Sequence, residues 1–170
     1  MSATHIAAGA LVLLACIPDL RIRRIPNALT LGAAGVAIAF HAATAGVSGL
    51  AVSAGGWLVG AALFFPIFAL RGMGAADVKL LAAVGAWLGP AQVIWVALIT
   101  SVAGGVLGLL IALFYGYLRT ALANLFSLLM QWRMSGIRPV EEMTLSGHRG
   151  PRLAYAVPIA VGTLVTLWLK

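Results

Sequence analysis

The chain is poor in charge. Charged side chains make up 9% of its 170 residues, whereas 62% of the residues are hydrophobic. A soluble domain typically has about 25% charged residues, so this composition excludes an ordinary water-soluble fold. The mean hydropathy of +1.06 agrees. The bilayer must therefore be the solvent for most of the chain.

Cysteine is also scarce, and the sequence has no pattern of metal ligands. Cys16 is the only cysteine, which excludes a disulfide framework and a zinc site built from cysteines. His5, His41 and His148 are scattered, and there is no HExxH motif. We therefore expect neither a metal nor an organic cofactor, and we interpret the three histidines as ordinary.

Long apolar runs are what the sequence does contain. Residues 28–70 and residues 80–118 have no Asp, Glu, Lys or Arg. Each run is about twice the ~20 residues that a helix needs to cross a bilayer core, so each should fold back as a helical pair. The runs are apolar on every face, which favours helices over a membrane β-barrel. The sequence predicts an all-α membrane protein with one domain over residues 1–170.

The apolar pattern predicts six hydrophobic helices. The fourth is expected to end at Gly89 and the fifth to begin beyond it, because Pro90 cannot continue a helical hydrogen-bond ladder. The alternative is a break near Thr100 and Ser101, with Pro90 as a kink. The expected helices cover residues 4–19, 28–46, 49–70, 77–88, 91–117 and 153–169.

A less apolar segment, residues 118–152, separates the last two hydrophobic helices. Residues 121–135 predict an amphipathic helix lying on the inner membrane surface, and residues 136–150 predict a loop because they contain several glycines and a proline. The apolar face of the amphipathic helix comprises Leu122, Leu125, Phe126 and Leu129.

The basic residues predict the orientation. With six helices, ten of the eleven lysines and arginines fall on one side of the membrane and only Lys170 on the other. By the positive-inside rule that side is cytoplasmic, so both termini face outside. Topology thus accounts for the net charge of +7, and we expect no nucleic-acid partner. The ten are Arg21, Arg23, Arg24, Arg71, Lys79, Arg119, Arg133, Arg138, Arg149 and Arg152.

Two of the four acidic residues are candidates for chemistry. Glu141 and Glu142 lie in the predicted cytoplasmic loop, where we expect a solvated role, whereas Asp19 and Asp77 lie at the ends of apolar helices on one predicted face. Ionisable groups there usually face an interior cavity. Two neighbouring carboxyl groups separate their ionisation, so that one acts as base and the other as acid in peptide hydrolysis. The alternative is that each aspartate pairs with a nearby cation such as Arg21, Arg23 or Lys79.

The residues around the aspartates resemble a known family. Asp19 is followed by a basic stretch with the sequence Arg24, Ile25, Pro26 and Asn27. The second aspartate stands in the sequence Gly72, Met73, Gly74, Ala75, Ala76, Asp77, Val78, Lys79 and Leu80. Together these segments resemble the type IV prepilin peptidase family, bacterial relatives of the GxGD intramembrane aspartic proteases. Residues 154–162 are similar to the last helix of that family.

The resemblance implies a specific activity. Asp19 and Asp77 would be the catalytic pair of an aspartic endopeptidase that removes leader peptides from prepilin or pseudopilin precursors at the cytoplasmic face of the bacterial inner membrane. The chain lacks the four-cysteine insert of larger members, so it resembles the peptidase-only branch of Flp/Tad-type pili. Expected partners are the precursor and the lipid bilayer, with pilus-assembly proteins as further candidates.

The flanking residues have roles that physical chemistry suggests. Gly72 and Gly74 permit a tight turn that a substrate strand could approach. Asp77 opens the fourth helix, whose dipole favours an anion. Asn27 can cap the second helix after Pro26 fixes the turn.

Two cations near the aspartates have several possible roles. Arg24 and Lys79 would hold the geometry of the aspartate pair, bind substrate carboxylates, or act as positive-inside anchors. The fourth helix spans only about 17 Å at 1.5 Å per residue. Because a helix of this length cannot cross a full bilayer, we expect either a thinned membrane or a water-filled pocket near Asp77.

One residue departs from the family pattern. Ala76 stands where the family has a glycine directly before the second aspartate. If that position needs a positive φ or close backbone approach, alanine would strain it. This departure leaves open a non-catalytic pilus-assembly factor. A small proton-coupled transporter using the two aspartates is another alternative, although the inverted repeats common in transporters are not found.

Two pairs of glycines four residues apart permit close helix packing. They are Gly56 with Gly60 and Gly104 with Gly108.

Overall fold

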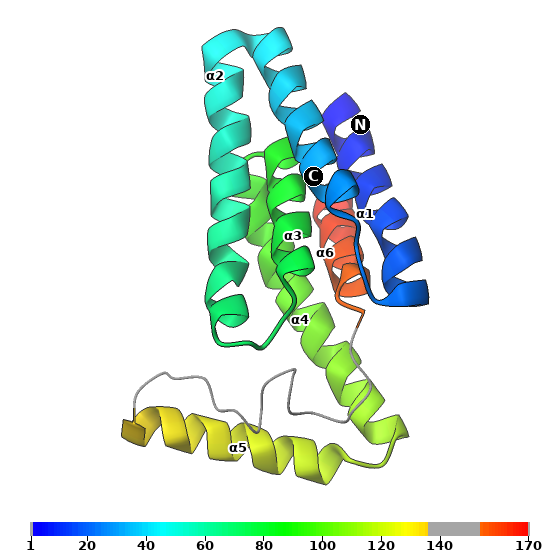
Figure 1. Cartoon of the computed structure of the whole chain (residues 1–170), viewed down its shortest axis with the longest axis vertical. Helices are drawn as coiled ribbons and strands as arrows, with labels where there is room; N and C mark the ends of the chain where they lie inside the picture. The colour runs from blue at the N-terminus through cyan, green and yellow to red at the C-terminus, as the bar shows by residue number, and fades with distance from the viewer. Residues whose placement is uncertain (1, 136–153, 170) are drawn as a thin grey trace.

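The computed structural model describes residues 2–135 and 154–169. These residues form helices and no strand (Figure 1), so the all-α prediction is confirmed. The helices are α1 (Ala3–Ile22), α2 (Asn27–Ala69), α3 (Ala75–Leu88), α4 (Pro90–Phe114), α5 (Leu118–Ser135) and α6 (Ala156–Trp168).

Helix α2 is a hairpin of two helical arms. The chain reverses at Gly46, whose backbone adopts φ 60° and ψ −142°, and the arms 27–45 and 47–69 run in opposite directions (Figure 1). We predicted a connection at residues 47 and 48, but helical structure begins directly after the glycine. The loop is unnecessary because glycine, without a Cβ, adopts a positive φ at little steric cost.

Helix α3 is the centre of the bundle. Val78 and all residues from 80 to 88 are buried, and α1, α2, α4 and α6 all contact this helix. The second arm of α2 packs closest, because a Cβ on Gly56 would collide with the carbonyl oxygen of Gly85, and one on Gly60 would lie 2.7 Å from the carbonyl oxygen of Leu81. The first glycine pair is therefore a close helix crossing.

The second glycine pair behaves differently along α4. A Cβ on Gly104 would lie 3.4 Å from the hydroxyl of Tyr155, whereas one on Gly108 would meet nothing within 4 Å. Only the first of these two glycines therefore lies at a helix contact.

The break after α3 is where we expected it. Gly89 has φ 83° and Pro90 begins α4. The alternative break was wrong, since Thr100 and Ser101 lie inside α4. A proline at the first helical position loses no hydrogen bond, because that N–H would have no intrahelical partner.

Three of the described helices are long and apolar enough to cross a membrane, namely α1, α2 and α4. Helices α3 and α6 have 14 and 13 residues, which is fewer than the ~20 of a full span. Many large apolar side chains on the outer surface of the bundle are exposed, as expected where lipid replaces water. The chain is a membrane protein, and six spans remain a prediction.

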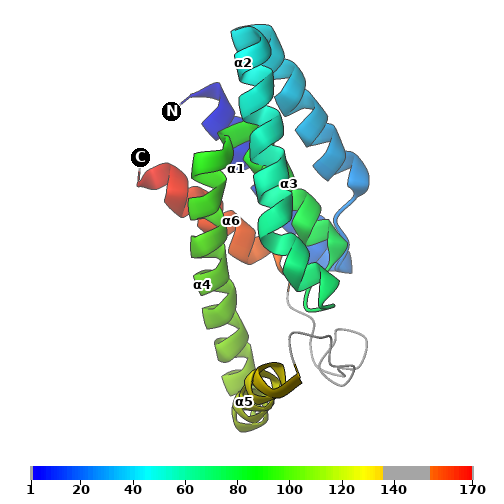
Figure 2. The same ribbon diagram turned by 90° about the vertical axis from the view of Figure 1, so that its left-hand side faces the viewer.

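Helix α4 runs past the ends of α1, α3 and α6, and α5 crosses its far end (Figures 1 and 2). Leu122, Leu125 and Phe126 are exposed on α5, and Arg119 and Arg133 are exposed as well. The helix predicted at 121–135 therefore exists and begins three residues earlier. Its place on the membrane surface stays a prediction, and the loop predicted at 136–150 lies outside the described residues.

Candidate active site

Three helix ends meet on one side of the bundle. The C-terminal end of α1 and the N-terminal ends of α3 and α6 lie at the same level, facing α5 (Figures 1 and 2). Helix α1 contacts both α3 and α6. Asp19 lies in the last turn of α1 and Asp77 in the first turn of α3, so the fold brings the two aspartates to the same end.

Asp19 is held by the start of α6. Its side chain is 6% exposed, and its Oδ2 accepts a hydrogen bond of 3.0 Å from the backbone N–H of Ala156, the first residue of α6. The N–H groups of a first helical turn have no partner inside the helix, and the helix dipole there favours negative charge. The carboxylate of Asp19 therefore receives electrostatic support from a helix that begins 137 residues later in the sequence.

Asp77 is the third residue of α3, which begins two residues before the predicted start. Its Oδ2 accepts the backbone N–H of Gly74 at 3.3 Å, so this carboxylate also lies at a helix N-terminus. A Cβ on Gly74 would lie 3.1 Å from that oxygen. Glycine at position 74 thus leaves room for the carboxyl group.

The two carboxyl groups lie close enough for their charges to interact. No ion pair links either aspartate to Arg21, Arg23 or Lys79 within the part of the chain that the structure describes. The alternative in which each aspartate pairs with a neighbouring cation is therefore not supported. The charged group that acts on Asp77 is instead the carboxyl group of Asp19.

Lys79 binds Asn27 and neither of the two aspartates. Its Nζ donates a hydrogen bond of 3.0 Å to Oδ1 of Asn27, joining the N-terminal half of α3 to the first residue of α2. Asn27 therefore does not cap α2; Pro26 precedes the first helical residue, and its carbonyl oxygen accepts the N–H groups of Leu29 and Thr30. Arg24 is exposed and has no hydrogen bond or ion pair to any other described residue.

The turn before α3 contains both glycines, but its left-handed residue is neither of them. The left-handed residue is Arg71, with φ 59°, and neither Gly72 nor Gly74 has a positive φ. The N–H groups of Arg71 and Gly72 close the end of α2 by binding the carbonyl oxygens of Phe68 and Ile67, which is a Schellman motif. The lack of a side chain at Gly72 avoids steric crowding, because a Cβ there would lie 3.1 Å from Cγ2 of Ile67.

Ala76 is not strained. It lies inside α3, where the backbone is helical, and it has no positive φ. Alanine has the most favourable helix propensity, so the replacement of the family's glycine fits this position. The doubt that rested on a positive φ at position 76 is thereby removed.

Tyr155 is a further candidate site residue, which we did not single out from the sequence. It directly precedes Ala156, whose N–H binds Asp19, and it is half-buried at the end of the bundle that carries both aspartates. The only sequence signal was its position in the segment similar to the family's last helix. Nothing in the local pattern placed it at that end of the bundle.

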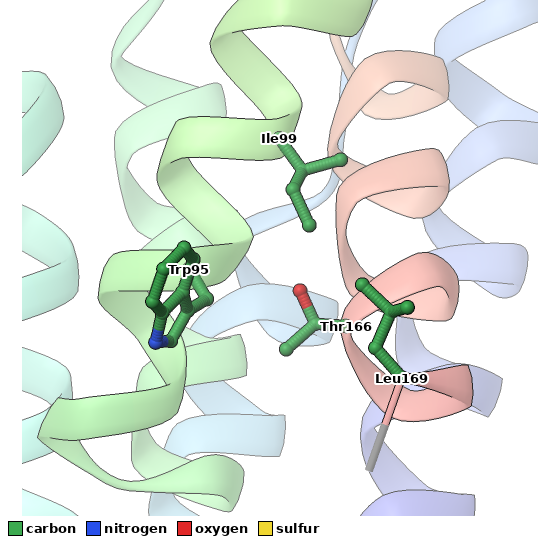
Figure 3. Close-up of a pocket in the computed structure, with 4 residues that line it drawn as sticks. All are labelled: Trp95, Ile99, Thr166 and Leu169. Carbon is green, nitrogen blue, oxygen red and sulfur yellow. The ribbon is translucent and has the colours of Figure 1, made fainter.

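A separate pocket lies between α4 and α6, away from the aspartates. It has a volume of about 220 Å³ and is lined by Trp95, Ile99, Thr166 and Leu169 (Figure 3). Thr166 is ten residues along α6 from Ala156, a distance of about 15 Å. Its hydroxyl is bound to the carbonyl oxygen of Gly162, so the pocket offers an apolar surface and no group for hydrolysis.

Among the comparisons with known proteins, the comparison with protein-family models gave a match, and it supports the resemblance seen in the sequence. A search of curated proteins found no match, and a search of solved structures found none either. The model of the type IV leader peptidase family matches residues 6–109. The match covers more than half of the chain and contains both aspartates. The chain therefore belongs to the type IV leader peptidase family, a family of peptidases.

Proposed function

We propose that the chain is an aspartic endopeptidase that removes leader peptides from prepilin-like precursors, with Asp19 and Asp77 as the catalytic pair. The carrying observation is that these aspartates, 58 positions apart in sequence, lie at one end of the bundle, each bound by a backbone N–H at a helix N-terminus. The family match supports the class of reaction.

The pair supplies the two proton transfers that peptide hydrolysis needs. The ionised carboxylate removes a proton from a water molecule, whose oxygen forms a bond to the scissile carbonyl carbon. The protonated carboxyl group gives its proton to the carbonyl oxygen, which produces a neutral tetrahedral diol. A proton then passes to the amide nitrogen and the C–N bond breaks, leaving a carboxylic acid on the leader and an amine on the mature protein.

The surroundings of the pair favour a substrate that is partly in the membrane. Helix α3, which carries Asp77, is short, and the bundle around it presents apolar side chains outward. A precursor with a basic leader and an apolar helix could leave the helix in lipid while its scissile bond reaches the pair. The single cysteine is consistent with the peptidase-only branch that serves Flp/Tad-type pili.

The test is direct cleavage. Purified protein in lipid nanodiscs is incubated with a precursor that has a basic leader and an apolar helix, and the products are weighed by mass spectrometry. We expect one cut between leader and helix. Intact precursor after prolonged incubation would contradict the proposal and favour the assembly factor. Aspartate-dependent proton flux into liposomes without cleavage would favour the transporter.

The proposed active site faces the cytoplasm, and labelling can test this orientation. In a Cys16→Ala background, Ala43→Cys should react with an impermeant maleimide on intact cells, whereas Thr120→Cys should react only after lysis. Both positions are exposed. Ala43 lies near the α2 reversal at the end opposite the aspartates, and Thr120 lies on α5 (Figure 1). The reverse labelling pattern would place the aspartates outside.

A further inference from the structure

Tyr155 is positioned by two helices at the end of the bundle that carries both aspartates. It stands directly before α6, and the following residue, Ala156, binds Asp19. The phenol ring crosses α4 at Gly104, because a Cβ there would lie 3.4 Å from the hydroxyl and 3.5 Å from Cε1. Gly104 of α4, which has no side chain, and the start of α6 thus hold the ring at the end of the bundle that carries Asp19 and Asp77.

The hydroxyl of Tyr155 has no hydrogen-bond partner among the residues that the structure describes. It makes no hydrogen bond to any residue within 2–135 or 154–169, although other hydroxyls in this bundle bind backbone carbonyl oxygens, as Thr163 and Thr166 do on the same helix. The phenol precedes the helix whose first N–H binds Asp19, and that helix also contacts α3, which carries Asp77. A donor at the end of the bundle that carries the two aspartates, without an acceptor among the described residues, is available to a bound molecule.

The acceptor that the reaction supplies is the carbonyl oxygen of the scissile peptide. This oxygen gains negative charge as water adds to the carbonyl carbon, and a preorganised donor in a water-poor site stabilises that charge. We propose that Tyr155 is a third catalytic residue, whose hydroxyl donates a hydrogen bond to the scissile carbonyl oxygen while Asp19 and Asp77 transfer the protons. This assignment rests on the proposed peptidase function.

Tyr155→Phe tests the proposal because it removes the hydroxyl and keeps the ring against Gly104. We expect kcat to fall about 100-fold, the usual lower range for losing one such donor, with little change in KM. Tyr115→Phe is the matched control, since Tyr115 is 70% exposed at the end of α4, and it should cleave at the native rate.

A second measurement separates catalysis from packing. A precursor peptide with a hydroxyethylene group in place of the scissile bond mimics the tetrahedral intermediate. Tyr155→Phe should weaken its binding about as much as it lowers kcat, while substrate affinity is kept. A purely structural role would lower both affinities together or move only the unfolding midpoint. This ratio of affinities decides the matter even if Tyr155→Phe is less stable.

The possible failures are distinguishable. Native kcat and native analogue binding in Tyr155→Phe would overturn the role of Tyr155 and leave the peptidase intact. Absence of cleavage by the native protein would overturn the peptidase function and the role of Tyr155 with it.

Discussion

Asp19→Asn and Asp77→Asn should each lower the rate of precursor cleavage by a factor on the order of 10⁴, the upper range for losing a general acid or base. The mechanism needs one carboxylate that accepts a proton and one carboxyl group that donates a proton, and an amide does neither at neutral pH. Rates are measured on one precursor for native protein and both variants by mass spectrometry.

Both variants should remain folded, which makes the loss interpretable. An asparagine side-chain oxygen can still accept the N–H of Ala156 or Gly74, the bonds that hold the native carboxylates. The unfolding midpoint and the elution volume in detergent should therefore stay near native values. Substantial cleavage by either variant would remove that residue from the mechanism, while cleavage by both would end the aspartic assignment altogether.

Gly56→Val should destabilise the bundle by roughly 3 kcal/mol or more, at the upper end of the cost of overpacking a core. Any side chain at this position collides with the backbone of Gly85 on α3. A rigid backbone carbonyl cannot move aside as a flexible side chain can, so α2 and α3 must separate. Thermal unfolding in detergent micelles measures the loss.

Gly55→Val is a closely matched control, because a Cβ on Gly55 meets nothing within 4 Å. It makes the same chemical change one position away in the same arm of α2, and its effect should be small. Equal unfolding midpoints for the two variants would show that the Gly56–Gly85 contact does not determine how these helices pack. Because α3 carries Asp77, Gly56→Val should also impair cleavage below its unfolding temperature.

The properties that depend on local sequence were predictable. Apolar runs identify the helices, because each helix satisfies its own backbone in lipid. Pro90 indicated the break before α4, because proline has no N–H and cannot continue the hydrogen-bond ladder of a preceding helix. The glycines four residues apart at 56 and 60 indicated a close crossing, although not with which helix. The two aspartates stood out because acidic residues are so few in this chain.

The properties that depend on how helices associate were decided by the tertiary structure alone. Asp19 meets Ala156 and Lys79 meets Asn27 because separate helices pack together, and no local pattern encodes that pairing. The left-handed turn at Arg71, where glycines stand nearby, is imposed by closure of α2 and the start of α3. Tyr155 comes to the end of the bundle with the two aspartates for the same reason. Its position is determined by the packing of α6 against α1 and α4, and the sequences of those helices do not indicate it.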